Sequence, residues 1–330
     1  MLKTLCRNSS SVRSTFKPTL TTKIVPQAAM ATGKADNKDL QANSLFDCSY
    51  IKAVVTGGGT GIGLMITQAL QSNGATVYIT GRREEVLQQT AKRYSTGPGK
   101  IIPLPGDIST RDGAVKIAKD VESKETNGIH LLVNNAGIAR DDATKYYSAG
   151  QPDMSDAKAI SEHFLKSEEK SWSETFQTNV TGAYFTSMAF LPLLAMGSGV
   201  TPGYTSQVVN VTSISGAMKG SSSGQPAYAT SKAAATQLSR VLAALFTDVN
   251  IRVNTIAPGV FPSEMTAGSS SEDNKSKLDM EMSNPAGRPG HDTDMGATIL
   301  FLAGRGGLFY NGQILYPDGG STLVQPAANN

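Results

Sequence analysis

Beyond residue 50, short apolar runs alternate with longer amphipathic segments, and this alternation constrains the fold more than any other feature. The apolar runs are the expected strands, at 53–56, 76–80, 101–104, 130–134, 207–212, 251–257 and 313–316. The amphipathic segments are the expected helices, at 62–73, 84–94, 111–124, 170–195, 227–247 and 293–303. Strands and helices that alternate in this way form βαβ units with parallel strands. The sequence therefore predicts one doubly wound α/β domain, with a seven-stranded parallel sheet and helices on both faces.

Two polar stretches lie outside this alternation. Residues 140–169 are rich in Asp, Lys and Ser, and we expect a plain surface insertion. Residues 264–290 follow the sixth strand directly. Ligands bind at the end of the sheet where that strand stops, so we expect this second stretch to form a lid.

The N-terminal stretch differs from the rest of the chain in composition. It is rich in Ser and Thr and has six basic residues but no acidic residue before Asp36. This composition is typical of a mitochondrial transit peptide, and it equally fits an unstructured extension ahead of a translation start at Met30. We therefore predict an extension over residues 1–45 and a folded domain over 46–330, in a mitochondrial or a cytoplasmic protein.

Charge, cysteine content and hydropathy exclude several classes of function. The chain has a net charge of +3, and its basic excess lies in the extension, so no nucleic-acid interface is expected on the domain. Cys6 and Cys48 are too few for a disulfide framework. His130, His163 and His291 show no ligand spacing, so no metal site is expected. No apolar run reaches the roughly 18 residues of a membrane span.

A glycine-rich segment, VVTGGGTGIG, joins the first expected strand to the first expected helix. Its glycines permit a tight turn and let a pyrophosphate approach backbone N–H groups at the helix N-terminus, where the helix dipole favours an anion. The segment therefore predicts a dinucleotide-binding loop. The residues expected to contact the cofactor there are Gly57, Thr60, Gly61, Ile62 and Gly63.

The residues after the second and third strands indicate which dinucleotide binds. An NAD site usually has an acidic residue about 20 positions beyond the glycines, to hold the ribose 2′-hydroxyl. Arg82 and Arg83 stand there instead, and a guanidinium can pair with a 2′-phosphate. We therefore predict NADP(H) as the cofactor. Asp107 follows the third strand and could bond the adenine amino group, and we place Ile108 in the same site.

Tyr228 and Lys232 are four residues apart in the expected helix 227–247, so they share one helix face. A phenol with a pKa near ~10 is a poor base, and a nearby ammonium is expected to lower that pKa. Tyr228 can then exchange a proton with a carbonyl or alcohol oxygen while a nicotinamide exchanges hydride with the adjacent carbon. Without a supporting context, however, a Tyr and a Lys at this spacing are more often surface residues.

Several separated motifs supply that context, because in order they resemble those of the short-chain dehydrogenase/reductase family over roughly residues 50–320. The motifs are TGGGTGIG, NNAG at 134–137, NVTGAYF with Asn179, VTSISG, YATSK at 228–232, APG and PDGG at 317–320. The match implies a Rossmann-type fold, a nicotinamide cofactor and a tyrosine-centred mechanism. PGVFPSEMT and TGRR are most similar to a branch that includes rhamnolipid-type 3-oxoacyl reductases and related fungal reductases.

The resemblance also implies roles for individual residues. Lys232 bonds the nicotinamide ribose, and Asn179 holds a water that relays protons past Lys232. The backbone of Val260 and the hydroxyl of Ser263 lie near the nicotinamide carboxamide; many members have Thr where Ser263 stands. Asn134 and Gly137, in the NNAG motif, belong to the cofactor site. The family further implies a homotetramer.

A serine hydroxyl is expected to polarise the substrate oxygen, and two serines compete for this role. Ser213 directly follows the fifth strand and precedes a glycine by three residues, as the family's catalytic serine does. Ser215 stands thirteen residues before Tyr228, the family's usual interval, whereas Ser213 stands fifteen before it. We predict Ser213, with a two-residue insertion in the segment KGSSSGQ.

These observations predict an NADPH-dependent enzyme that reduces a ketone, either a 3-oxoacyl thioester or a metabolite carbonyl, to a secondary alcohol. One alternative is an NADP-linked alcohol dehydrogenase that oxidises a sugar, a polyol or another secondary alcohol. A second alternative is a catalytically silent NADP-binding scaffold. The partner in the first two cases is a small-molecule carbonyl or alcohol substrate.

Overall fold

A computed structural model describes residues 36–324 of the chain, and the predicted transit peptide lies outside them. Residues 36–324 belong to one compact unit. Residues 36–45, the last part of the predicted extension, contain the short helix α1 (Ala42–Leu45). That helix packs against the single turn η4 (Arg305–Gly307) near the C-terminus.

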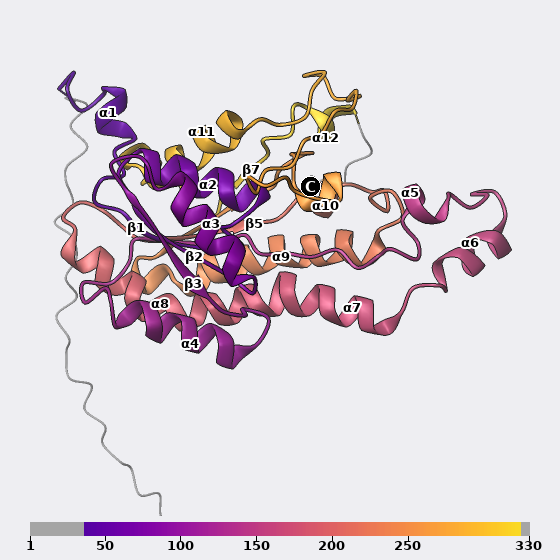
Figure 1. The fold of residues 1–330 in the computed structure, drawn as a ribbon, viewed down its shortest axis with the longest axis horizontal. Helices are drawn as coiled ribbons and strands as arrows, with labels where there is room; N and C mark the ends of the chain where they lie inside the picture. The colour runs from indigo at the N-terminus through magenta and orange to yellow at the C-terminus, as the bar shows by residue number, and fades with distance from the viewer. Residues whose placement is uncertain (1–35, 325–330) are drawn as a thin grey trace, which may run out of the picture. The chain divides into compact units, whose positions relative to one another are not determined.

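Seven parallel strands form one sheet, in the order β3-β2-β1-β4-β5-β6-β7 (Figure 1). The strands are β1 (Lys52–Thr56), β2 (Thr76–Gly81), β3 (Lys100–Pro105), β4 (Leu131–Asn134), β5 (Gln207–Val211), β6 (Arg252–Ile256) and β7 (Ile314–Leu315). The predicted doubly wound sheet is confirmed. Strand order reverses at β1, which pairs with β2 on one side and with β4 on the other. In open sheets of this kind, ligands bind at the carboxyl ends of the strands beside that reversal.

Six longer helices cover the two faces of the sheet, as the amphipathic pattern predicts (Figure 1). One face holds α2 (Gly61–Ser72), α3 (Glu84–Tyr94) and α11 (Asp292–Ala303), and the other holds α4 (Arg111–Glu122), α8 (Ala183–Val200) and α9 (Pro226–Leu245). The remaining short helical elements of the described chain are α5 (Tyr146–Ala149), α6 (Ala157–Phe164), α7 (Glu169–Phe176), η2 (Ile214–Gly216), η3 (Thr247–Val249), α10 (Glu264–Ala267) and α12 (Ser321–Val324).

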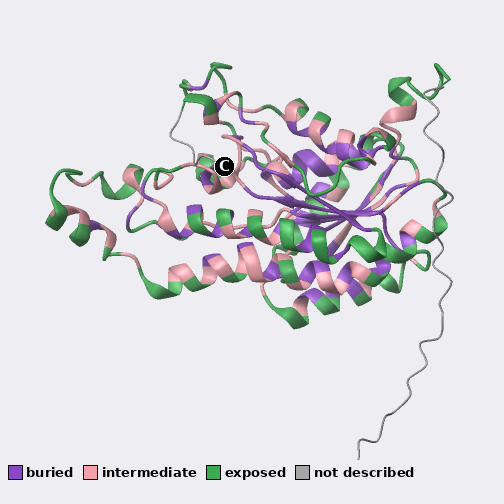
Figure 2. Ribbon diagram, turned by 180° about the vertical axis from the view of Figure 1, so that it is seen from behind, coloured by how far each residue is buried: buried purple, intermediate pink, exposed green. Residues whose placement is uncertain are grey.

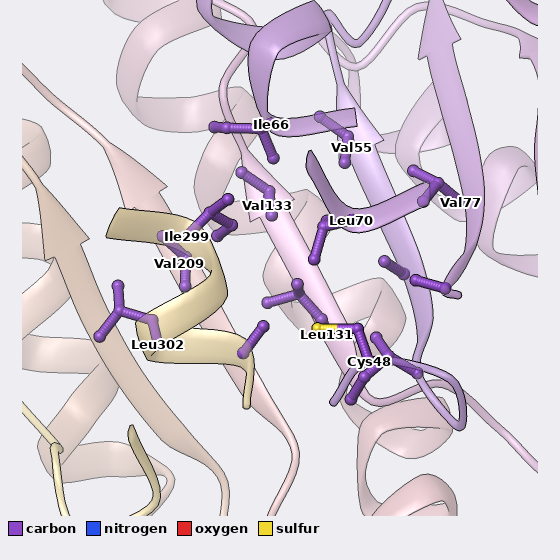
Figure 3. Close-up of a cluster of buried hydrophobic side chains, with 14 of the residues drawn as sticks. Cys48, Val55, Ile66, Leu70, Val77, Leu131, Val133, Val209, Ile299 and Leu302 are labelled. Carbon is purple, nitrogen blue, oxygen red and sulfur yellow. The ribbon is translucent and has the colours of Figure 1, made fainter. Parts of the chain in front are cut away.

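The strands are buried on both sides, so their successive residues enter two separate cores (Figure 2). In β1, Val55 faces α2 and α11 while Val54 faces α4 and α8, because side chains alternate along a strand. Figure 3 shows the first core, where Ile66 and Leu70 of α2 meet Ile299 of α11. Each such side chain that leaves water contributes about 1.5–3 kcal/mol. The resulting sheet is a rigid base for the loops at its carboxyl edge.

The helix expected at 170–195 is one long helical stretch with an irregular centre. It consists of α7, a π-helical segment η1 (Gln177–Gly182) and α8. By length and composition alone, Glu169–Val200 passes the test for a membrane span. Phe190 and Leu194 are nevertheless fully buried against the sheet. The core helix of a folded domain passes the same test, because it is also long and apolar. The π-helical turn includes Asn179, and such turns are frequent at functional sites.

Both polar stretches make specific contacts. Residues 140–169 contain α5 and α6, which project at one end of the domain (right in Figure 1). This stretch is hydrogen-bonded to the loop before α9: the Tyr146 N–H donates to the Ser223 carbonyl, and the Thr144 hydroxyl donates to the Gly224 carbonyl. Residues 264–290 are anchored to α3, where the Tyr94 hydroxyl donates to the Asp273 carbonyl at 2.6 Å.

Candidate active site

The loop between β1 and α2 forms a cradle of backbone groups beside the strand-order reversal. Gly57 has a φ of +64°, and its N–H donates to the Thr80 carbonyl at the end of β2 at 2.7 Å. A Cβ at Gly63 would lie only 2.0 Å from the Gly57 carbonyl oxygen, so only glycine allows the loop to close onto the helix. Thr60 is the N-cap of α2, and the first turn of this helix contains no acidic residue. The cradle therefore fits the pyrophosphate of a dinucleotide, and the contacts expected for Gly57, Thr60, Gly61, Ile62 and Gly63 stay a prediction.

Asn135, which the sequence analysis did not single out, braces this cradle. Its Nδ2 donates to the carbonyls of Thr56 and Gly57, at 2.9 and 3.2 Å. The Thr56 hydroxyl in turn accepts the N–H groups of Asn135 and Ala136, both at 3.0 Å. The predicted cofactor residue Asn134 directs its side chain into the interior instead, where Nδ2 donates to Asn210 Oδ1 at 2.8 Å.

The charged residues predicted to select the cofactor follow β2 and β3. Arg82 and Arg83 are both exposed, and the Arg83 guanidinium donates two hydrogen bonds to the Glu264 carboxylate, at 3.1 and 2.8 Å. This contact holds the pKa of Glu264 below its usual range, because the guanidinium bonds its ionised form. Asp107 is exposed, and it accepts the Ser109 N–H at 2.9 Å in a local turn. Ile108 is buried, with its carbonyl oxygen against Gly182 of η1.

The predicted catalytic side chains gather at the carboxyl ends of β4 and β5. Tyr228 lies in the first turn of α9, which packs against η2, and Ser213 is the N-cap of η2. The Lys232 Nζ lies over the Tyr228 ring, 5.7 Å from its centre, and donates to the Val211 carbonyl at 3.1 Å. Gly137 lies next to both Asn179 and Lys232. A Cβ built on Gly137 would be 3.2 Å from Asn179 Oδ1 and 3.3 Å from Lys232 Nζ. The structure thus brings together the four residues that the sequence analysis selected.

The expected lowering of the Tyr228 pKa is not found. Burial raises the pKa of the Tyr228 phenol, and the hydrogen bond with Ser213 opposes that rise only in part. Burial also lowers the pKa of Lys232 to about 8, because the site removes its ammonium from water. The spacing of the two residues predicted their proximity correctly, but it carried no information on the desolvation of the phenolate, which is the largest cause of the raised pKa. In the protein alone, the Tyr228 phenol therefore favours its protonated form.

Ser213 and Ser215 have different partners. The Ser213 Oγ accepts the Ser215 N–H at 3.1 Å, as the N-cap of η2, and its hydroxyl favours the ionised form of the Tyr228 phenol. The Ser215 hydroxyl instead bonds the Ser222 hydroxyl at 2.7 Å, in the loop before α9. Ser222 and Ser223 both have φ in the left-handed region, at 53° and 58°. This geometry is consistent with an insertion in the loop and with Ser213 as the serine that faces Tyr228.

Asn179 uses its side chain to join neighbouring segments. Its Oδ1 accepts the Ile138 N–H at 2.8 Å, and its Nδ2 donates to the Ile138 carbonyl and to Ser231 Oγ, each at 2.9 Å. Ser231 in turn donates to the Tyr228 carbonyl at 2.7 Å. Asn179 therefore fixes the NNAG segment to the helix that holds Tyr228.

The segment after β6 packs against the cradle through Ser263, and the contacts of Val260 and Ser263 with the nicotinamide carboxamide stay a prediction. A Cβ at Gly61 would be 2.9 Å from the Ser263 Cβ, so Ser263 lies directly against the phosphate loop. The Val260 carbonyl accepts the Gly290 N–H at 2.9 Å. Ser263 is also the N-cap of α10, in a capping box with Thr266.

Asp141 caps α9, the helix that holds Tyr228 and Lys232, although the sequence analysis assigned Asp141 to a plain insertion. Its two carboxylate oxygens accept the N–H groups of Ala227 and Tyr228, at 3.0 and 3.1 Å. Asp141 is only 3% exposed, and burial raises the pKa of its carboxyl. The sequence signal that could have indicated this cap is at the start of α9. Gln225 stands at the N-cap position before Pro226, and its side chain makes no capping hydrogen bond. A helix with so poor a local cap needs an acceptor from elsewhere in the chain.

We expect Asp141→Ala to lower the free energy of unfolding by about 2 kcal/mol, because it leaves two N–H groups at the buried helix start without an acceptor. Thermal or urea unfolding of the purified protein measures this loss. The matched control is Asp156→Ala, since Asp156 caps the exposed helix α6 by accepting the Lys158 N–H at 2.9 Å. Equal stability of the two variants would contradict a special role for Asp141.

Within residues 36–324, no three His, Cys, Asp or Glu side chains gather as a metal site would require. His130 is buried and accepts the Lys52 N–H through Nδ1 at 3.1 Å. His163 is buried too, and its Nε2 contacts the Thr144 carbonyl at 2.8 Å. Both of these histidines are therefore hydrogen-bonded to backbone groups of the fold.

Comparison with known proteins identifies relatives over nearly the whole domain. A family model described as enoyl-(acyl carrier protein) reductase matches residues 57–322. The short-chain dehydrogenase/reductase PhomF' of Diaporthe leptostromiformis is 39% identical over 291 residues, which cover 88% of this chain and 97% of that protein. The rhamnolipids biosynthesis 3-oxoacyl-(acyl-carrier-protein) reductase of Pseudomonas aeruginosa is 34% identical over 273 residues, covering 82% of this chain and 96% of that protein.

A solved structure is similar over the same region. The Pseudomonas aeruginosa RhlG/NADP active-site complex superposes with a TM-score of 0.69 at 32% identity. The match covers 84% of this chain and 98% of that chain.

Proposed function

Because this chain belongs to the short-chain dehydrogenase/reductase family, we propose that it is an NADPH-dependent oxidoreductase that reduces a ketone to a secondary alcohol. The observation on which the proposal depends is the pair of Tyr228 and Ser213. Ser213 caps η2 where this turn packs against α9, the helix that holds Tyr228, and burial raises the pKa of the Tyr228 phenol, which favours its protonated form. A protonated phenol in a site for a small molecule suits the reduction of a carbonyl better than the oxidation of an alcohol.

The motif resemblance to the family and to its rhamnolipid branch is confirmed by these relatives. NADP(H) as the cofactor is supported by the similar structure, whose title names NADP, and by the two arginines that follow β2 in this chain. The glycine cradle offers backbone N–H groups for the pyrophosphate. Arg82 and Arg83 are placed to attract the 2′-phosphate, which distinguishes NADP(H) from NAD(H).

The chain's residues divide the reaction between them. Ser213 donates a hydrogen bond to the substrate oxygen and holds it beside Tyr228. Tyr228 gives that oxygen its proton as the carbonyl becomes an alcohol. Lys232, whose pKa is about 8, is partly protonated near neutral pH and stabilises the phenolate that remains. The nicotinamide, when bound, supplies the hydride to the carbonyl carbon.

The proposed substrate class is a 3-oxoacyl thioester or a related metabolite ketone. The Pseudomonas aeruginosa relative is named as a 3-oxoacyl-(acyl-carrier-protein) reductase, which supports the first of these. The test is NADPH oxidation, followed by absorbance, with a panel of 3-oxoacyl thioesters, simple ketones and sugars. Matched assays with NADP⁺ and the corresponding alcohols test the oxidative direction. NADPH binding without turnover on any substrate in either direction would contradict the proposal and favour a silent scaffold.

The two serines give a sharper prediction for the site. We expect Ser213→Ala to lower kcat by about a hundredfold or more, because the substrate oxygen loses a positioned donor. Ser215→Ala should change kcat by less than about threefold, since its hydroxyl bonds Ser222 rather than Tyr228. Steady-state kinetics on both variants decide between them. A wild-type Ser213→Ala enzyme beside an inactive Ser215→Ala enzyme would reverse the assignment.

The oligomeric state and the location of the protein remain proposals. A homotetramer is supported by apolar side chains exposed on α8 and α9, among them Met196, Val200, Val241 and Leu245. A mitochondrial or cytoplasmic location depends on residues 1–35, which lie outside the described part of the chain.

A further inference from the structure

We propose that Glu264 is a specificity-determining residue that occupies Arg83 in place of the cofactor's 2′-phosphate, and that NADP(H) displaces it on binding. The inference rests on the proposed function, because it takes Arg83 as a ligand of the 2′-phosphate. Glu264 is 181 positions away from Arg83 in the sequence. The inference adds Glu264 to the residues that select the cofactor.

The geometry of the pair is that of a phosphate contact. Arg83 Nη1 donates to Glu264 Oε1 at 3.1 Å, and Nη2 donates to Oε2 at 2.8 Å. This parallel, two-bond arrangement is the one that a guanidinium also forms with two oxygens of a phosphate. The same donors cannot serve the carboxylate and a phosphate together. A 2′-phosphate bound to Arg83 therefore has to replace the Glu264 carboxylate.

Glu264 is held in this position from its own side as well. It is the first residue of α10, and its Oε1 also accepts the Ser270 hydroxyl at 2.7 Å. The neighbouring Ser263 lies against Gly61 of the phosphate loop. Arg82, the other predicted phosphate ligand, makes no ion pair among residues 36–324. Glu264 thus screens one of the two arginines and leaves the other open to attract the cofactor.

The displaced carboxylate belongs to the segment that we expected to be a lid. Further along this segment, Asn274 Nδ2 donates to the Thr90 hydroxyl at 3.0 Å, and Thr90 donates to the Gly59 carbonyl at 3.0 Å. Residues near 274 therefore stay attached to α3 and the cradle when Glu264 leaves Arg83. Release is confined to the first part of the segment, around α10. A cofactor with a 2′-phosphate loosens this part, and a cofactor without one does not.

The test compares cofactor binding by wild-type enzyme and Glu264→Gln, using NADPH and NADH fluorescence titrations without substrate. Glutamine keeps the size of the side chain but removes its charge, so it competes poorly for Arg83. We expect the NADPH dissociation constant to fall about fivefold, the upper range for an exposed ion pair, while the NADH constant changes less than twofold. The second readout is hydrogen exchange of residues 264–270, which should be faster with NADP⁺ than with NAD⁺.

The matched control is Asp294→Asn, which breaks the other two-bond pair of similar exposure, between Arg288 and Asp294. It should leave the preference for NADPH over NADH unchanged. Weaker NADPH binding by Glu264→Gln, or an equal gain for both cofactors, would overturn the inference, as would equal hydrogen exchange with both. If the wild-type enzyme does not prefer NADPH at all, the cofactor assignment itself fails. A wild-type preference that Glu264→Gln does not alter refutes this inference alone.

Discussion

Tyr228→Phe should lower kcat by about a thousandfold while the NADPH dissociation constant stays within about twofold of wild type. The substitution removes one hydroxyl in the first turn of α9, which is the group that we assign to proton donation. The aromatic ring remains, so Lys232 keeps its contact with the ring face and its bond to the Val211 carbonyl. Turnover is measured by NADPH absorbance with the best substrate of the panel, and binding is measured by NADPH fluorescence.

Tyr78→Phe is the control for this experiment. Tyr78 is also buried, but its hydroxyl donates to Glu125 Oε1 at 2.9 Å, within the second core rather than in the site. We expect this variant to lose some stability and to keep its kcat. If Tyr228→Phe retained more than about a tenth of wild-type kcat, the proton would have to come from another group, and the proposed mechanism would be wrong.

Gly63→Ala should raise the NADPH dissociation constant by about a hundredfold. The added methyl group would lie 2.0 Å from the Gly57 carbonyl oxygen and 2.5 Å from Asn135 Nδ2, so the cradle has to open to admit it. Distortion of a well-packed site by an extra methyl group costs about 1–3 kcal/mol, and about 3 kcal/mol corresponds to the hundredfold loss. Isothermal titration with NADPH, together with thermal unfolding, separates lost binding from lost folding.

Gly199→Ala provides the comparison for glycine substitution in a helix. No atom lies within 4 Å of a Cβ built at Gly199, in the last turn of α8. Alanine there should stabilise the helix slightly and leave NADPH binding unchanged. If Gly63→Ala bound NADPH as tightly as Gly199→Ala does, the loop after β1 would not be the pyrophosphate cradle.

The sequence predicted the sheet and its covering helices well because hydrophobic periodicity is a local property. Each expected strand overlaps one strand of the structure, and each of the six expected helices overlaps a helical stretch. The π-helical turn at 177–182 had no such signal, since the apolar pattern continues across it. The inward direction of Asn134 and the bracing role of Asn135 depend on where β4 ends, which periodicity fixes only to within a residue or two.

The sequence predicted the candidate site less completely, because its chemistry depends on burial and on distant contacts. The spacing of Tyr228 and Lys232 placed the two side chains together correctly, but it carried no information on desolvation, which sets the direction of both pKa shifts. Asp141 and the catalytic helix are separated by 86 residues, and Arg83 and Glu264 by 181. Neither pair could be predicted without knowing which loops meet at the carboxyl edge of the sheet.

The cap that Asp141 provides has a consequence for exchanging segment 140–169 between relatives. Segment 140–169 looks like an exchangeable module, because it projects from one end of the domain and lies outside the sheet (Figure 1). Replacing it as a unit with the equivalent segment of a relative would remove the acceptor for the Ala227 and Tyr228 N–H groups. A graft that starts at residue 142 keeps that acceptor. The usable boundary for chimeras therefore lies two residues inside the insertion that the sequence suggests.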